Sequence, residues 1–208
     1  MLPMFPLGTN IFPFEVVPLH IFEDRYRTLM DDIIASSALD ERPATFGIVM
    51  IERGSETGGG DVRSAVATRV DVLHSESFDD GRWGIVVAGV ERLDVVRWHE
   101  DDPYPIADVV SRDRHDTGGS LAEVEDMVEE SLRLGAKIFG GDVQELAELS
   151  GDPIERLDQL CALAPLTTFD RQQILEALTT DRQIELLAGA LADKLELLRA
   201  EVGRRTSD

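Results

Sequence analysis

The sequence MLPMFPLGTNIFPFEVVPLHIFEDRYRTLM, residues 1–30, contains the patterns that decide the fold. Its first apolar run, residues 2–7, is broken by two prolines. Because proline has no backbone N–H to donate to a central ladder, this run is predicted to be an edge or rim strand. Turn residues follow at 8–10. Residues 11–12 and 15–19 are predicted to be two more short extended pieces.

A helix is predicted to begin after Phe22, where the spacing of apolar residues changes. Glu23 and Asp24 lie in its expected first turn, where the helix dipole favours negative charge. The apolar residues then recur at i, i+3, i+4, i+7 and i+8, which is typical of a helix with one buried side. They are Tyr26, Leu29, Met30, Ile33 and Ile34. We therefore expect Tyr26 to be a core residue.

Composition favours a globular protein of the cytoplasm. The chain has 208 residues, of which 43% are hydrophobic and 29% charged, as in ordinary globular domains. No apolar run approaches the roughly 20 residues of a membrane span. The N-terminus lacks the basic and apolar regions of a signal peptide. The single cysteine, Cys161, excludes an internal disulfide bond and fits a reducing compartment.

The chain is strongly acidic, with 41 acidic and 20 basic residues and a net charge of −21. The excess is spread along the chain. Residues 1–116 hold 22 acidic and 11 basic residues, and residues 117–208 hold 19 and 9. Such a protein repels phosphate groups unless it carries a local basic patch. We therefore expect neither nucleic acid nor an anionic membrane as a partner.

Strand patterns dominate the rest of the first half, at residues 45–51, 65–74, 83–88, 91–98 and 104–110. Gly89 is predicted to mark a bulge or bend. The glycine-rich stretch 52–63 is followed by a strand pattern and not by a helix or a Gly-Lys-Ser/Thr sequence. It is therefore predicted to be a hairpin loop and not a phosphate site. The polar stretch 112–120 is predicted to be a flexible connector.

The second half has helical spacing throughout. Ser120, Asp152 and Thr180 are each followed three residues later by Glu or Gln, which is the capping-box spacing of a helix start. Several apolar stripes follow these starts, and helices must pack on one another to bury them. The sequence therefore predicts an α+β protein whose β-rich part precedes a helical bundle.

These motifs resemble the N-terminal, substrate-binding domain of the Lon ATP-dependent proteases. The most specific match is Pro-Leu-His-Ile-Phe-Glu at residues 18–23, followed by Arg-Tyr-Arg at 25–27. Asp-Gly-Arg-Trp at 80–83 and Pro-Tyr at 103–104 come in the family's order. Phe14 departs from the pattern, because the family usually has glycine there. The resemblance implies a PUA-like pseudo-barrel β domain with one packed helix, residues 1–116, and a helical bundle, residues 117–208.

The resemblance also implies a non-catalytic module that binds polypeptide. Its expected partners are unfolded or degron-bearing polypeptides, and a separate ATP-dependent protease for which it would act as an adaptor or chaperone-like protein. No Gly-x4-Gly-Lys-Ser/Thr sequence occurs in these 208 residues. The two lysines, Lys137 and Lys194, do not lie in the setting of a Ser-Lys dyad. We expect no catalytic residue, no metal and no cofactor.

The candidate polypeptide-binding residues are Phe12, Phe14 and Arg25. A phenylalanine in a turn that elsewhere holds glycine is expected to point outward and form an apolar patch. The alternative is that Phe14 covers the helical bundle. Arg25 either presents its guanidinium to a partner or pairs with a nearby carboxylate such as Glu23.

Four further residues of the matching stretch are expected to have structural roles: Pro18, His20, Phe22 and Tyr26. His20 lies on a mostly apolar stretch, so a hydrogen-bonded structural histidine is favoured over a metal ligand. The four histidines of the chain lack metal-ligand spacing.

Two other functions fit the predicted fold. PUA-like folds include RNA-binding proteins, although the acidic charge argues against that function here. A small hydrolase with an unrecognised site is the second. Its mark would be a pocket in which histidine and carboxylate groups converge with shifted pKa values.

Overall fold

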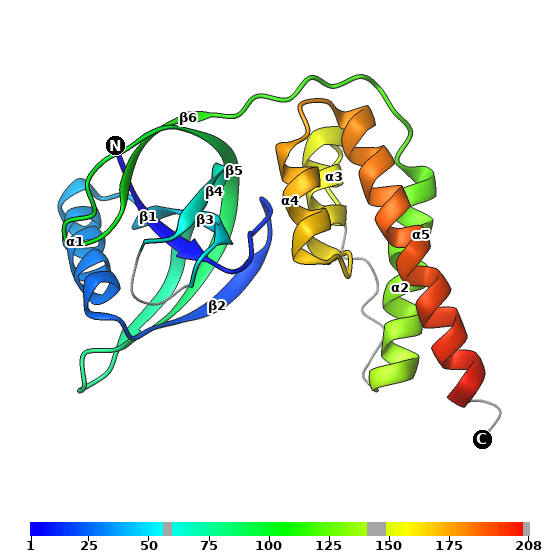
Figure 1. Ribbon diagram of the computed structural model, residues 1–208, viewed down its shortest axis with the longest axis horizontal. Coiled ribbons are helices and arrows are strands. Elements are labelled where there is room, and N and C mark those ends of the chain that lie inside the picture. Colours follow the sequence, from blue (N-terminus) through cyan, green and yellow to red (C-terminus); the bar gives the residue numbers. More distant parts are fainter. Residues whose placement is uncertain (56–59, 141–148, 206–208) are drawn as a thin grey trace. The chain divides into compact units, whose positions relative to one another are not determined.

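The computed structural model describes residues 1–55, 60–140 and 149–205 (Figure 1). The chain is an α+β protein, as the sequence predicts, and it divides into two compact units, Met1–Arg112 and Asp113–Asp208. The first unit contains six strands and one helix, and the second contains four helices within the described residues. The expected division into a β domain, residues 1–116, and a helical bundle, residues 117–208, stays a prediction.

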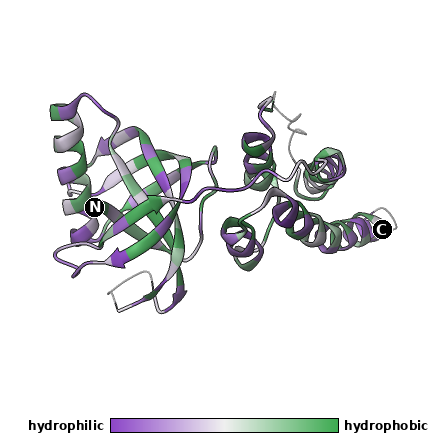
Figure 2. Cartoon of the chain, turned by 90° about the horizontal axis from the view of Figure 1, so that it is seen from above, coloured by the Kyte–Doolittle hydropathy of each residue, from purple (hydrophilic) through white to green (hydrophobic). Residues whose placement is uncertain are grey.

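The elements of the first unit are β1 (Leu2–Leu7), β2 (Val16–Ile21), α1 (Asp24–Asp40), β3 (Thr45–Arg53), β4 (Val62–Ser77), β5 (Trp83–Trp98) and β6 (Ile106–Ser111). Those of the second are α2 (Ala122–Phe139), α3 (Pro153–Leu163), α4 (Thr168–Glu176) and α5 (Thr180–Arg205). Hydrophobic and hydrophilic residues both occur along the strands of the first unit (Figure 2). Residues 56–59 of the glycine-rich loop lie outside the described residues.

The six strands form one sheet in the order β2-β5-β4-β3-β1-β6, and an additional β5–β6 pairing closes it into a pseudo-barrel. β1 and β3 are parallel, and the other pairs are antiparallel. One side of β5 is shared by two strands. Its first half pairs with β2 and its second half with β6. Within the described residues, β2 has no strand on its other side.

The prediction that the first run is an edge or rim strand is wrong, because β1 lies between β3 and β6. β1 pairs with β6 at Leu2 and Pro3 and with β3 from Met4 onward. The Met4 N–H donates to the Pro105 oxygen on the β6 side, at 2.8 Å. Successive backbone N–H groups of a strand point to opposite sides. The N–H that Pro6 lacks would point toward β6, but the pairing with β6 has already ended there. The N–H that Pro3 lacks would point toward β3, before the pairing with β3 begins.

The stretches 83–88 and 91–98, predicted to be two strands, form the single strand β5. The bulge expected near Gly89 is present as a register shift opposite Arg69 and Val70. A bulge lets one long strand bend and serve different neighbours along its length.

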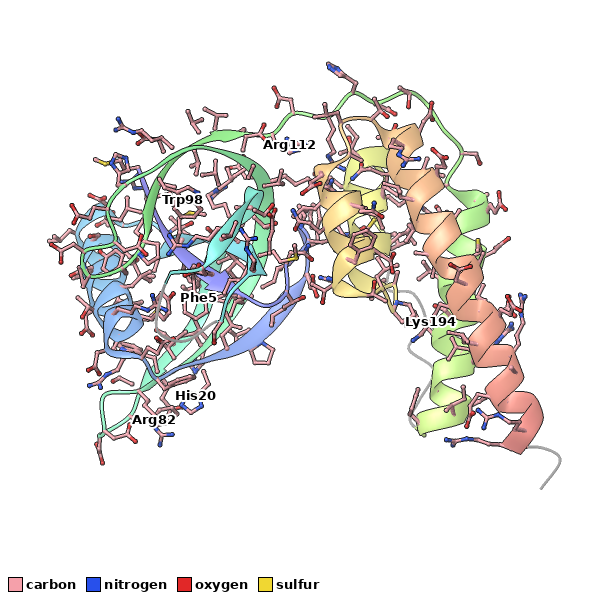
Figure 3. All side chains as sticks on the ribbon, in the orientation of Figure 1. Phe5, His20, Arg82, Trp98, Arg112 and Lys194 are labelled. Atoms are coloured by element: carbon pink, nitrogen blue, oxygen red, sulfur yellow. The ribbon has the colours of Figure 1, made fainter. Side chains whose placement is uncertain are left out.

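The core of the first unit is built on aromatic contacts between β1, β3 and α1. Tyr26, 2% exposed, lies edge-on to Phe5 with ring centroids 4.4 Å apart. Phe5 also meets Phe46 edge-on, at 6.1 Å, and Figure 3 shows Phe5 in the interior of the β unit. Leu29, Met30 and Ile33 complete the buried side of α1, as the sequence predicts. Burial raises the pKa of Tyr26.

The helix starts of the second unit agree only partly with the predicted capping boxes. Asp152 caps α3, where its side chain accepts from two backbone N–H groups. Thr180 lies inside α5, and the hydroxyl of Thr179 accepts from the Arg182 N–H at 3.3 Å. At α2 the N-cap residue is Leu121, and although the Ser120 hydroxyl accepts from the Ala122 N–H at 3.4 Å, no capping box forms, so that prediction for Ser120 is wrong.

Part of the connector predicted over residues 112–120 is held by hydrogen bonds to the start of α5, and its flexibility stays a prediction. His115 donates its N–H to the Leu178 oxygen and accepts from the Thr180 N–H, at 3.0 and 3.1 Å. The Thr117 N–H donates to the Thr180 hydroxyl at 3.0 Å. Backbone groups at the start of α5 hold this segment, and its polar composition alone gives no sign of them.

Two arginines mark where the chain passes from one unit to the other. The Arg112 N–H donates to the Arg92 oxygen at 2.9 Å, within the first unit. Arg114 binds Asp158 in the second unit, with Nη2 2.5 Å and Nη1 3.2 Å from its carboxylate oxygens. Nη1 also donates to Gln183 at 3.0 Å. The Asp158 side chain is 2% exposed, so this is a buried ion pair.

We expect Tyr26→Ala to lower the free energy of unfolding by about 3 kcal/mol, because it leaves a cavity between β1 and α1. Tyr26→Phe is expected to change it by less than about 1 kcal/mol, because the buried hydroxyl has no hydrogen-bond partner in the described residues. Urea unfolding of both variants checks this pair. An equal loss in the two would show that the hydroxyl, and not the ring, stabilises the core.

Arg114→Ala is expected to destabilise the second unit by about 3 kcal/mol, because Asp158 stays buried without its arginine. Hydrogen exchange of α3 and α5 measures the loss. The control is Arg182→Ala in α5 of the same unit, which removes an ion pair whose arginine is 53% exposed and which should cost less than about 1 kcal/mol. A cost no greater than that of the control would contradict the structural role of Arg114.

Candidate functional site

The residue that departs from the sequence pattern, Phe14, lies in a tight turn between β1 and β2. The Glu15 N–H donates to the Phe12 oxygen at 3.2 Å and closes the turn. Pro13 occupies the second position, and Phe14 occupies the third with φ +67°. A turn with proline followed by positive φ is type II, whose third position favours glycine. Phe14 therefore holds a backbone conformation that L side chains adopt at a cost.

Hydrogen bonds on both sides hold this turn against β5. The Phe14 N–H donates to the Gly89 oxygen at 2.8 Å, and the Gly89 N–H donates to the Glu15 oxygen at 2.9 Å. The Glu15 carboxylate accepts from the Phe12 N–H at 2.9 Å. The turn is thus fixed at both ends, and Phe14 has a defined position.

The two phenylalanines of the turn face opposite ways. Phe12 is fully buried, with the Arg92 guanidinium 5.7 Å from its ring centre, and Phe14 is 43% exposed. Phe12 was a candidate binding residue from sequence, but in this structure its side chain belongs to the core. Phe14 is available to a partner, as expected, and whether it binds one stays a prediction.

Phe14 begins a row of exposed side chains that follows β2. Alternate residues of a strand point to the same face, and here the even-numbered residues point outward. We call this row the β2 stripe; its members are Phe14, Val16, Pro18, His20 and Phe22. Val16 and Phe22 are each 57% exposed. The stripe is a continuous, mainly apolar strip beside the unpaired side of β2.

Side chains from β5 and the β4–β5 turn widen this strip. Pro18 pairs with Val86 and Val16 with Ala88 in the register between β2 and β5. Phe78, which follows β4, is 40% exposed, and its ring centre is 6.1 Å from that of His20. Figure 3 shows His20 on the outer side of the β unit, away from Phe5 in the interior.

Of the four residues expected to be structural, only Tyr26 is buried. Pro18, His20 and Phe22 are exposed members of the β2 stripe. His20 belongs to β2 and does not lie inside the core as a structural histidine would. Exposed apolar residues in a row are more typical of an interaction surface than of a folding motif.

Arg25 makes the ion pair that the sequence allowed. Its Nε lies 3.2 Å from the Glu23 carboxylate, and its guanidinium lies 4.4 Å from the centre of the Tyr26 ring. The Arg25 side chain is only 17% exposed. These contacts support a structural role for Arg25, and binding of a partner through it stays a prediction.

One hollow beside α1 in the first unit has a volume of about 410 Å³ and is lined in part by titratable residues. The Tyr104 hydroxyl donates to Asp32 at 2.7 Å, and burial together with this bond raises the pKa of Tyr104 to about 12. Arg42 pairs with Asp40 in the same lining. Neither histidine nor cysteine lines this hollow, so it lacks the converging groups that a hydrolase would need.

Other function classes also gain no support from the described residues. They contain no group of three or more His, Cys, Asp or Glu side chains that could hold a metal ion. None of the helices described is long and apolar enough to cross a membrane. The basic patch that RNA binding would need is not visible in the sequence either.

The sequence indicated Phe14 but not the stripe that continues from it. Along residues 14–22, exposed and less exposed side chains alternate in the structure. The sequence does not reveal this alternation, because the inward residues Val17, Leu19 and Ile21 are apolar as well. Both faces of the strand are therefore apolar enough to be read as core. Phe78 could not be found from sequence, because its contact with His20 depends on the pairing of β4 and β5 with β2.

Comparisons with known proteins give the family context. Residues 1–193 match the family described as the ATP-dependent protease La (LON) substrate-binding domain. The Lon protease of Desulfosudis oleivorans is 24% identical over 203 residues, which are 95% of this chain and 24% of that protein. The Lon protease of Phenylobacterium zucineum is 24% identical over 208 residues, 97% of this chain and 26% of that protein. The chain thus spans about a quarter of the length of these curated relatives.

Two solved structures share the fold. A Lon N-terminal domain protein from Xanthomonas campestris aligns with a TM-score of 0.61 and 23% identity, covering 90% of this chain and 96% of that one. The N-terminal domain of Mycobacterium avium complex Lon protease aligns with a TM-score of 0.59 and 17% identity, covering 92% and 98%. At these identities the likeness shows the fold alone.

The positive φ at Phe14 leads to a prediction about stability. Phe14→Ala and Phe14→Gly both remove the ring, but only glycine adopts this conformation without strain. We expect the glycine variant to be more stable than the alanine variant by about 1 kcal/mol, measured by urea unfolding. An alanine variant as stable as the glycine variant would show that position 14 carries no backbone strain.

Proposed function

The chain belongs to the ATP-dependent protease La (LON) substrate-binding domain family, and we propose that it is a non-catalytic module that binds unfolded or degron-bearing polypeptide through the β2 stripe. The stripe presents apolar side chains to solvent on an otherwise acidic protein, and such patches are typical of interaction sites. Aromatic residues, which often dominate the binding energy of such sites, stand at both of its ends, at Phe14 and Phe22.

The observation that carries this proposal is the conformation of Phe14. A left-handed backbone costs an L residue about 1–2 kcal/mol, and glycine would avoid that cost. Full burial of the ring does not offset this cost, because 43% of the residue is exposed. Strain that the fold does not require is typical of functional positions. A fixed, exposed ring loses little conformational freedom on binding, which favours affinity.

The polypeptide is proposed to bind through side-chain contacts and not mainly as an added strand. β2 has an open side within the described residues, so strand addition is the alternative. Pro18, in the middle of β2, cannot donate a backbone hydrogen bond to a new strand. The Glu15 oxygen accepts from the Gly89 N–H, so the backbone groups of odd-numbered residues face β5. The β2–β5 ladder continues without a register shift. The N–H that Pro18 lacks would therefore point to the open side of β2. Side-chain contacts do not depend on that donor.

In the cell, such a module would act as an adaptor or chaperone-like protein in the cytoplasm. It would hold polypeptides for refolding or pass them to a separate ATP-dependent protease. The match to the substrate-binding part of Lon proteases supports this role. A polypeptide-binding module needs no cofactor, so none is proposed.

The double variant Phe14→Gly/Phe22→Ser tests the proposal. We expect it to bind labelled, reduced and carboxymethylated α-lactalbumin, a permanently unfolded protein, at least about tenfold more weakly than the unmodified chain, because both aromatic anchors are lost. Fluorescence anisotropy measures the affinity. Urea unfolding is expected to shift by less than about 1 kcal/mol, because the Phe22 side chain is mostly exposed and glycine relieves the strain at position 14 while the partly buried Phe14 ring is lost.

The matched control removes two exposed phenylalanines of the helical unit, in the variant Phe139→Ser/Phe169→Ser. These residues are 81% and 69% exposed. The control should bind the unfolded protein as the unmodified chain does. If it weakens binding as much as the stripe variant, or if the stripe variant binds normally, the β2 stripe is not the binding surface.

A further inference from the structure

The outward face beside the β2 stripe changes from apolar to acidic across three strands. Glu76 of β4 lies opposite Gly84 of β5, which in turn lies opposite His20 of the stripe. Neighbouring strands are about 4.8 Å apart, so Glu76 lies about two strand spacings from the stripe. Asp79 directly follows Phe78, whose ring contacts His20. Two exposed carboxylates thus border the apolar strip on its β4 side.

The positive charges of the first unit are largely held in local ion pairs. This unit contains no lysine, because the two lysines of the chain are residues 137 and 194. Eight of its arginines pair with carboxylates: Arg25, Arg27, Arg42, Arg63, Arg69, Arg82, Arg97 and Arg112. A guanidinium that is already paired gives little attraction to an acidic partner.

The charges nearest the stripe therefore sum to a negative field. Arg82 is the closest exposed cation on the β4–β5 side, and its backbone N–H and guanidinium hold the pKa of Asp80 below its usual range. This pair cancels. Within the described residues, Glu76 and Asp79 form no ion pair and are exposed. Two carboxylates whose charge is not cancelled by an ion pair therefore border the stripe on its β4 side, next to His20 and Phe78.

We infer that the β2 stripe selects apolar polypeptide segments flanked by lysine or arginine and rejects segments flanked by aspartate or glutamate. The inference rests on the proposed function and adds that the charges flanking the apolar segment decide which polypeptide binds. Apolar contacts with the stripe supply the affinity, and the carboxylates along its border attract cationic flanks and repel anionic ones. Charge complementarity of this kind sets partner choice and the association rate.

Three labelled peptides with one apolar core and flanks of lysine, serine or glutamate test the inference by anisotropy. At low salt, the lysine-flanked peptide is expected to bind about tenfold more tightly than the glutamate-flanked one, with the serine-flanked peptide in between. At about 1 M salt, where the Debye length is about 3 Å, the three affinities are expected to converge.

The variant Glu76→Gln/Asp79→Asn tests whether the charge preference comes from the carboxylates that border the stripe. It is expected to lose most of the preference for lysine flanks while binding the serine-flanked peptide normally. The matched control, Glu52→Gln/Glu100→Gln, removes two exposed carboxylates, one in β3 and one just after the end of β5 that does not pair with β2. It should keep most of the preference, because these carboxylates lie near the opposite ends of β4 and β5 from Glu76 and the Coulomb interaction weakens with distance.

The outcomes separate the two proposals. If all three peptides bind with equal affinity, charge selection is overturned and polypeptide binding stands. If none of them binds, both proposals fail. A preference that the control variant abolishes as fully as the stripe variant would overturn the assignment to the border of the β2 stripe.

Discussion

The first unit depends on one strand, β5, that forms backbone hydrogen bonds with two different strands along the same side. β5 pairs with β2 through its first half and with β6 through its second. The change of partner takes place at Gly89, where a side chain would place Cβ 2.0 Å from the Phe12 oxygen. Only glycine allows the turn before β2 to lie this close to β5. Closure of the barrel and the position of Phe14 therefore rest on the same contact.

The local part of the fold could be read from sequence, and the non-local part could not. The buried side of α1 follows from spacing alone, because a helix repeats its own geometry. The place of β1 in the sheet depends on a parallel partner some 40 residues away, Met4 pairing with Gly47, and no local pattern records it. The fixed segment before α2 is a similar case, because Arg114 meets Asp158 only after α3 and α5 have packed.

The candidate site shows the same division. Phe14 could be found because the resemblance to the Lon family places glycine at this position, and its positive φ explains why glycine suits the turn. The outward row from Val16 to Phe22 was ambiguous, because the strand is apolar on both faces and only the pairing with β5 decides which face is buried. The carboxylates that border it come from β4 and the turn after it, so their position is a property of the folded sheet.

An exposed apolar strip beside an open strand is a hazard for a protein, because two copies could join there. Two features of this chain oppose that. Pro18 removes a donor from the open side, which weakens pairing between two β2 strands. The net charge of −21 makes any two copies repel each other. The acidic border that turns away a second copy attracts a cationic segment, so protection from self-association and selection of a client follow from the same charges.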